Sequence, residues 1–282
     1  MEALREITIE KLIERYSVLL LDAYGVLVHK SGALTGAPHL IAELNRAQKP
    51  YYILTNDASR LPRTMAERFQ KFGLAISPDR IISSGSLLND YFAQNQLAGA
   101  RCVVLGPHDS ARYVEMAGGK VVSPTNSFDV LVIGDEAGYP FLETVDCVLT
   151  GLFNKLDHGD AVRLVLPNPD LIYPKTGSDF GITSGSVALI FEAALMQRYP
   201  AGPQLHFERL GKPHAAIFEE ALRRCGTNDM VMVGDQLETD IRGANNFGID
   251  SVLVGTGVTK TTLGKISANL RPTYRMHSIT SG

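Results

Sequence analysis

Four separated segments of the sequence join an apolar run to polar residues that could carry chemistry. These residues are Asp22 in LLLDAYGVL, Thr55 and Asn56 in YYILTND, Lys212 in LGKPHAAIF, and Asp235 with Asp240 in MVMVGDQLETDI. An isolated aspartate after a strand is commonly a helix cap. Four such segments in one chain indicate a shared site.

The three aspartates predict a metal site. If their strands are neighbours, Asp22, Asp235 and Asp240 meet at one edge of the sheet. Two like charges about 4 Å apart repel by roughly 4 kcal/mol at an effective dielectric near 20, and a divalent cation would relieve this repulsion. A donor set of carboxylates without His or Cys favours Mg²⁺ over zinc.

The remaining polar residues predict a phosphate-binding function. Lys212 supplies a fixed positive charge, and Thr55 and Asn56 supply hydrogen-bond donors. Beside a magnesium site, these groups could hold a phosphoryl group and stabilise its oxygens during transfer.

Short β-rich runs alternate with helix-length segments, which predicts an α/β fold of Rossmann-like type with parallel sheets covered by helices. The uninterrupted apolar runs VLLL and MVMV indicate strands buried on both faces. The predicted strands span residues 17–22, 50–55, 80–83, 102–106, 129–134, 161–167, 229–235 and 250–255.

The segment Ser-Gly-Ser occurs twice, at residues 84–86 and 184–186, each time before an apolar helical run. In one interpretation the two segments are unrelated helix caps. In the other they are flexible joints on either side of an inserted domain.

The order and spacing of the four segments resemble the haloacid dehalogenase superfamily. The segments LDAYGVL, LTNDAS, NPDLIYP, GKP and GDQLETDIRGA are similar to its NagD-like class IIA branch, and the resemblance extends from Val18 to about Val258. In that branch an α/β cap domain is inserted between the second and third motifs. The resemblance thus implies a core formed by residues 1–85 and 184–282 and a cap formed by residues 86–183.

The resemblance also implies roles for individual residues. Asp22 would be the nucleophile that becomes an aspartyl phosphate. The backbone carbonyl of Tyr24 would join Asp22 and Asp235 around Mg²⁺, with Asp240 as a further ligand or an orienting group. The residues implied to contact the phosphoryl group are Gly25, Thr55, Asn56 and Lys212, of which Lys212 would also neutralise the aspartates.

Tyr24 departs from the family pattern, which usually has a second aspartate there as the general acid and base. A phenol can donate a proton but is a poor base at neutral pH, and losing acid–base assistance typically costs roughly 10²–10⁴ in rate. Three interpretations stay open: Tyr24 is the acid itself, another group such as His29 or Asp57 replaces it, or the protein has little turnover or needs a good leaving group.

These observations leave two hypotheses from different classes. The first is a Mg²⁺-dependent phosphatase that hydrolyses a small phosphorylated metabolite through phospho-Asp22. The second is a phosphate-binding or regulatory protein with little turnover. A nicotinamide dehydrogenase is disfavoured because no GxGxxG follows a strand.

Composition limits the class of protein. The net charge is −3 and basic residues are scattered, so nucleic acid is not expected as a partner. Without a signal-peptide pattern or an apolar run of about 18 residues, a cytoplasmic protein without membrane attachment is expected. The three cysteines show no CxxC spacing and predict neither zinc nor disulfides. The sequence does not identify the substrate, and it leaves a homo-oligomer open.

Overall fold

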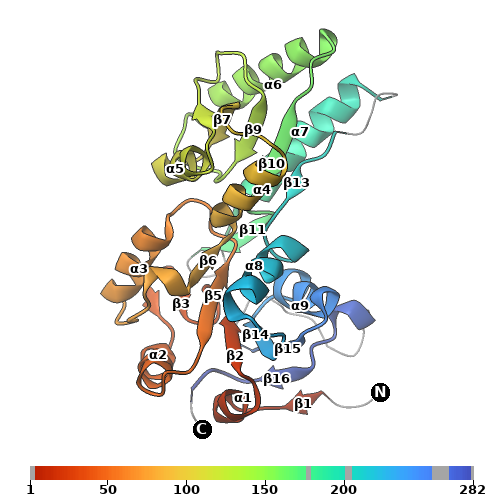
Figure 1. Ribbon diagram of the computed structural model, residues 1–282. Coiled ribbons are helices and arrows are strands. Elements are labelled where there is room, and N and C mark those ends of the chain that lie inside the picture. Colours follow the sequence, from red (N-terminus) through yellow and green to blue (C-terminus); the bar gives the residue numbers. More distant parts are fainter. Residues whose placement is uncertain (1–3, 176–178, 201–204, 256–266, 281–282) are drawn as a thin grey trace. The chain divides into compact units, whose positions relative to one another are not determined.

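The computed structural model describes residues 4–175, 179–200, 205–255 and 267–280. The chain divides into two compact units. The first unit comprises residues 1–55, 62–83 and 212–282, and the second unit comprises residues 56–61 and 84–211. Each unit has a parallel sheet with helices packed on it (Figure 1). The predicted α/β class is therefore confirmed.

The first unit contains a seven-stranded sheet in the order β1-β16-β15-β14-β2-β5-β6, and every pairing within it is parallel. Its strands are β1 (Arg5–Glu6), β2 (Val18–Leu21), β5 (Tyr51–Thr55), β6 (Ile81–Ser83), β14 (Met230–Gly234), β15 (Asp250–Val254) and β16 (Tyr274–Met276). A short hairpin pairs β3 (Val28–His29) with β4 (Gly32–Ala33). The carboxyl ends of β14, β2 and β5 lie side by side, as the convergence of polar residues requires.

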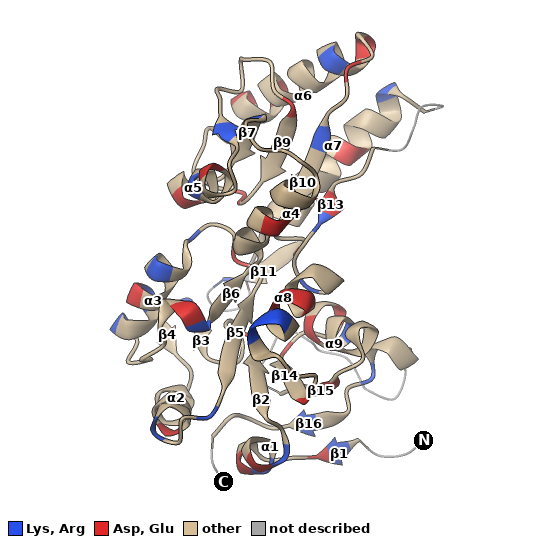
Figure 2. Ribbon diagram, in the orientation of Figure 1, with Lys and Arg blue, Asp and Glu red and all other residues tan. Residues whose placement is uncertain are grey.

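Helices cover both faces of this sheet, with α2 and α3 on one side and α8 and α9 on the other (Figure 1). The helices of the first unit are α1 (Ile9–Arg15), α2 (Ala37–Arg46), α3 (Pro62–Lys71), α8 (Ala215–Cys225) and α9 (Arg242–Phe247). The central strands β2, β5 and β14 contain no charged residue, while α3 carries both acidic and basic residues (Figure 2).

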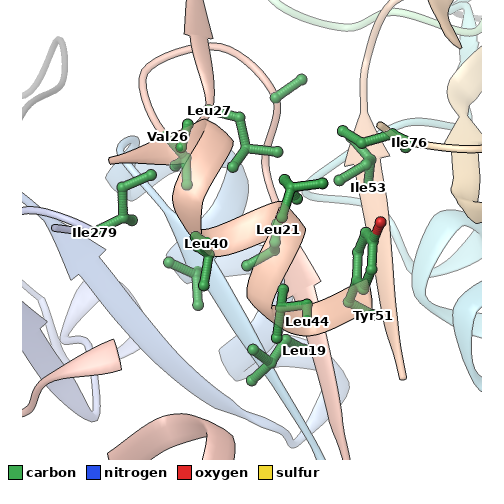
Figure 3. Packing of buried hydrophobic residues seen from close by; sticks show 14 of the residues in the cluster. Leu19, Leu21, Val26, Leu27, Leu40, Leu44, Tyr51, Ile53, Ile76 and Ile279 are labelled. Carbon is green, nitrogen blue, oxygen red and sulfur yellow. The ribbon is translucent and has the colours of Figure 1, made fainter. Parts of the chain in front are cut away.

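The main core of the first unit explains why β2 is entirely apolar. Leu19 and Leu21 pack with residues of α2 and with Tyr51 and Ile53 of β5 (Figure 3). Leu20 is also fully buried, and successive side chains of a strand point to opposite faces. Burial on both faces fixes the strand, and with it the position of Asp22 directly after its end.

The second unit contains a five-stranded parallel sheet in the order β13-β10-β9-β7-β8. Its strands are β7 (Arg101–Leu105), β8 (Lys120–Val121), β9 (Val130–Ile133), β10 (Arg163–Leu166) and β13 (Glu208–Arg209), with a separate antiparallel hairpin of β11 (Ile172–Pro174) and β12 (Phe180–Ile182). Its helices are α4 (Leu88–Gln94), α5 (His108–Met116), α6 (Phe141–Asp157) and α7 (Ser184–Arg198).

The second unit extends further toward the C-terminus than the predicted cap. The predicted cap ends at residue 183, whereas the second unit continues to Gly211. Helix α7 causes the difference, because Phe191 is fully buried in the core formed by β7, β9, β10 and α6. Glu192 also accepts hydrogen bonds from the Phe207 N–H at 2.9 Å and from Arg209 of β13 at 3.0 Å. Movement of a cap about the Ser-Gly-Ser segments stays a prediction.

None of the helices in the described ranges is both long and apolar enough to cross a membrane.

Phe191→Ala should destabilise the second unit selectively. Truncating a buried phenylalanine typically costs about 3–5 kcal/mol, so hydrogen exchange should speed up at β9 and β10 more than at β2 and β14. The control is Ile190→Ala, because Ile190 lies on the same helix and is 41 % exposed. Equal acceleration in both sheets would contradict the assignment of α7 to the second unit.

Candidate active site

Asp22 and Asp235 follow two strands that are direct neighbours. The pairing of β2 with β14 places Leu21 opposite Val233, and the Asp22 N–H donates to the Val233 carbonyl at 2.9 Å. Asp240 completes the group: one carboxylate oxygen from each of the three residues lies within 4.8 Å of the others, and all three residues are buried. The three aspartates therefore converge as the sequence predicts.

Lys212 lies among these carboxylates and is itself buried. Its Nζ donates to Asp22 Oδ1 at 2.6 Å, to Asp240 Oδ1 at 2.7 Å and to the Leu54 carbonyl at 3.0 Å. An ammonium group has three hydrogens, so these three acceptors use its whole donor capacity. Lys212 thus ties the two acidic segments to the end of β5. A contact between Lys212 and a phosphoryl oxygen stays a prediction and would require one of these hydrogens to change partner.

Burial and charge act against each other in this cluster. Burial raises the pKa of Asp22 to about 7, although the neighbouring Lys212 acts in the opposite direction. Burial by itself would lower the pKa of Lys212, but Asp22 and Asp240 outweigh it and raise that pKa above its ordinary value. Lys212 is therefore a permanent cation, while Asp22 needs further positive charge to stay fully ionised at neutral pH.

Asp240 is oriented by the chain around it. It lies in a π-helical turn, Leu237–Ile241, which leads into α9. Its Oδ1 accepts from Lys212, and its Oδ2 accepts from the Gln236 N–H at 3.1 Å. Single π-helical turns are uncommon and often occur at functional sites. This turn directs the Asp240 side chain back toward the end of β14.

Two glycines allow the backbone to approach the acidic side chains closely. A Cβ atom on Gly25 would lie 2.2 Å from Asp235 Oδ2, and Gly25 has a φ of +81°. A Cβ atom on Gly234 would lie 2.3 Å from the Asp240 Cβ. A side chain at either position would displace the neighbouring aspartate, and a backbone contact of Gly25 with a phosphoryl group stays a prediction.

Thr55 and Asn56 are adjacent in the chain but belong to different units. Thr55 is buried at the end of β5, next to the carbonyl of Leu54 that accepts from Lys212. Asn56 instead donates from Nδ2 to Asp170 Oδ1 at 2.9 Å, within the second unit. Phosphoryl contacts by Thr55 and Asn56 stay predictions.

Tyr24 lies in the loop after Asp22, and its hydroxyl group accepts a hydrogen bond from Nη1 of Arg68 on α3. Arg68 is not among the residues predicted from the sequence. It stands 44 residues from Tyr24 in an ordinary amphipathic helix, so no local signal marks it. Tertiary packing alone brings the two side chains together.

The other acid–base candidates are occupied elsewhere. Nδ1 of His29 accepts from the Ser31 N–H at 3.1 Å within its own hairpin. Asp57 accepts from the Ser59 N–H at 2.7 Å and pairs with Arg60 at 2.9 Å in the second unit. Neither contact supports the replacement of Tyr24 by these residues.

Two family models match this chain. Residues 19–120 match the model of the haloacid dehalogenase-like hydrolases, and residues 209–281 match a second, HAD-hydrolase-like model. The chain belongs to the haloacid dehalogenase superfamily. The predicted class IIA branch and hydrolase class are thereby confirmed.

Three relatives show how far the similarity extends. The dihydroxyacetone phosphatase of Corynebacterium glutamicum (strain R) is 27 % identical over 242 residues, which cover 85 % of this chain and 81 % of that protein. The acid sugar phosphatase of Staphylococcus aureus is 26 % identical over 265 residues, or 93 % of this chain and 95 % of that protein. The crystal structure of a possible sugar phosphatase from Cytophaga hutchinsonii superposes with a TM-score of 0.85 at 29 % identity, covering 99 % of this chain and 100 % of the other.

The acidic cluster fits a divalent cation. Three carboxyl groups beside the one ammonium group of Lys212 would leave two uncompensated negative charges when all are ionised, and a bound cation would keep Asp22 in that form. The ligand atoms would all be oxygen, which suits a hard cation such as Mg²⁺. Asp22, Asp235 and Asp240 are the side chains that could hold it.

Gly25→Ala should weaken Mg²⁺ binding, because the added methyl group displaces the carboxylate of Asp235. Gly73→Ala is the matched control: Gly73 has a φ of +79°, but nothing lies within 4 Å of the place that its methyl group would take. Both variants should lose about 1–2 kcal/mol of folding stability from the left-handed backbone. Only Gly25→Ala should lose the Mg²⁺-induced rise in melting temperature. Equal Mg²⁺ responses in the two variants would contradict the role given to Gly25.

Proposed function

We propose that this protein is a Mg²⁺-dependent phosphatase that hydrolyses a small phosphorylated metabolite through a phosphoryl group carried transiently on Asp22. The observation that carries the proposal is the buried cluster of Asp22, Asp235 and Asp240 around Lys212. An aspartate with an ammonium group on one oxygen and two acidic neighbours from another segment is suited to phosphoryl transfer.

Each residue of the cluster has a role in the proposed reaction. The carboxylate of Asp22 attacks phosphorus as the nucleophile, and water then hydrolyses the aspartyl phosphate. Lys212 holds one Asp22 oxygen and keeps Asp240 in place. Asp22, Asp235, Asp240 and the backbone carbonyl of Tyr24 would hold Mg²⁺. When bound, that ion would offset the negative charge of the phosphoryl oxygens.

Phosphoryl-group contacts are assigned to Gly25, Thr55, Asn56 and Lys212. Thr55 ends the strand next to the one that positions Asp22, and parallel strands place such residues at one edge of the sheet. Asn56 follows Thr55 in the chain. Gly25 lies in the loop after the nucleophile, where its backbone N–H donates to the Val28 carbonyl at 3.0 Å and would have to change partner to bind a phosphoryl oxygen.

The substrate class is supported by the relatives. Two of the relatives matched by sequence are named dihydroxyacetone phosphatase and acid sugar phosphatase. A phosphorylated sugar or three-carbon compound is therefore the first class to test. Phosphate release from a panel of phosphorylated metabolites would identify the substrate.

Asp22→Asn should abolish hydrolysis of 4-nitrophenyl phosphate, because an amide cannot serve as the nucleophile. The fold should persist, since the amide oxygen can still accept from Lys212. Asp90→Asn is the control, because Asp90 is an exposed residue of α4. Phosphate release should be measured with Mg²⁺ and after chelation, and chelation should abolish it in the wild-type protein.

The same assay separates the phosphatase from the phosphate-binding protein. A nitrophenyl leaving group needs little protonation, so a protein with an intact nucleophile and cation site should release phosphate from it whatever the role of Tyr24. Binding of phosphate without any release would favour the binding protein.

A further inference from the structure

Arg68 holds Tyr24 through two kinds of contact. Nη1 of Arg68 donates to the Tyr24 hydroxyl oxygen, and the guanidinium carbon lies 5.5 Å from the centre of the Tyr24 ring. The same guanidinium lies 5.4 Å from the centre of the Phe72 ring. All three residues belong to the first unit. Arg68 therefore contacts both aromatic rings and donates one hydrogen bond to Tyr24.

The backbone on both sides of this contact is also fixed. Helix α3 is anchored in the core of the first unit through Met65 and Phe69, the two nearest buried large side chains around Arg68. On the other side, Tyr24 forms a β-bridge with Val28 in the loop that follows Asp22. The contact is thus a defined feature of the fold and places the Tyr24 hydroxyl group in a set position.

The direction of this hydrogen bond determines what the hydroxyl group can still do. A guanidinium group has donors only, so the hydrogen in the bond comes from Arg68 and the phenolic hydrogen of Tyr24 must point elsewhere. Tyr24 is 36 % exposed and stands two residues after Asp22, so its side chain is open to solvent and begins from the loop that carries the nucleophile. The contact with Arg68 therefore does not use the phenolic hydrogen of Tyr24.

We infer that Arg68 is a positioning residue, and that the Arg68–Tyr24 pair takes the place of the carboxylic acid that the family pattern has at this position. The inference rests on the proposed phosphatase function. It adds a residue from a distant helix to the reaction and gives Tyr24 a chemical role beyond its backbone carbonyl.

Tyr24 and Arg68 could serve both phosphoryl transfers, the first from the substrate to Asp22 and the second from Asp22 to water. Tyr24 gives up one proton in the first transfer and regains one in the second. In the first, an oxygen of Asp22 bonds to phosphorus, the ester P–O bond breaks, and the Tyr24 hydroxyl proton passes to the leaving oxygen. The phenolate then lies against the guanidinium of Arg68. In the second, a water oxygen bonds to phosphorus, the bond between phosphorus and Asp22 breaks, and a water proton returns to Tyr24. Arg68 stabilises the charge that Tyr24 carries between the two transfers.

A pair of aryl phosphates tests the inference. Phenyl phosphate and 4-nitrophenyl phosphate have similar shapes, but phenoxide is the poorer leaving group and depends more on protonation. Arg68→Met keeps the length of the side chain and removes its charge and donors, and Tyr24→Phe removes only the hydroxyl group. Each variant should lose at least about tenfold more kcat/KM on phenyl phosphate than on 4-nitrophenyl phosphate. Arg68→Lys, which retains a donor and a charge, should recover part of the loss.

A double variant separates positioning from packing. If Arg68 acts through Tyr24, adding Arg68→Met to Tyr24→Phe should cause no further change in the ratio of the two activities. Arg63→Met is the control, because Arg63 lies on the same helix and its side chain is 86 % exposed. It should leave both activities unchanged.

If Arg68→Met lowers kcat/KM equally on the two substrates, Arg68 is only a packing residue and the inference is overturned. The inference is also overturned if Arg68→Met lowers kcat/KM on neither substrate. The proposed phosphatase function would survive both outcomes. If the wild-type protein with Mg²⁺ hydrolyses neither substrate, the proposed function itself fails, and this inference fails with it.

Discussion

The ammonium group of Lys212, buried among carboxylates, is the interaction on which the site depends. It binds Asp22, Asp240 and the end of β5 at once, and so fixes three segments that are far apart in the sequence. Removing one partner of a buried ion pair typically costs about 3–5 kcal/mol, because the remaining charge is left uncompensated. Lys212 offsets only part of the negative charge, and the remainder suits a divalent cation. The contacts of Lys212 with the carboxylates therefore both stabilise this edge of the sheet and hold the acidic side chains in place.

The fold and the acidic cluster were accessible from the sequence because their signals are local. Apolar runs such as VLLL and MVMVG identify buried strands, and parallel strands bring the residues after them to one edge. Asp22 and Asp235 needed only these two rules to be placed together. Asp240 lies five residues after Asp235, and the π-helical turn that orients it has no comparable sequence signal.

Other features depend on packing that the sequence pattern does not reveal. The Ser-Gly-Ser repeat suggests a domain boundary before α7, but Phe191 and Glu192 attach that helix to the second unit. Likewise, Arg68 meets Tyr24 only because α3 packs on the sheet beside the loop after β2. A recognisable motif thus locates the nucleophile Asp22. Arg68, which we infer to act with Tyr24, lies in a helix without any motif.

Direct detection of the phosphorylated residue is the most direct test of the central claim. The protein is mixed with Mg²⁺ and 4-nitrophenyl phosphate, quenched in acid during turnover, and treated with borohydride, which reduces an acyl phosphate to an alcohol. Peptide mass spectrometry should then find homoserine in place of Asp22 in the wild-type protein and an unmodified peptide in Asp22→Asn. Continuous phosphate release with no modification at Asp22, or with modification at another carboxylate, would contradict the account.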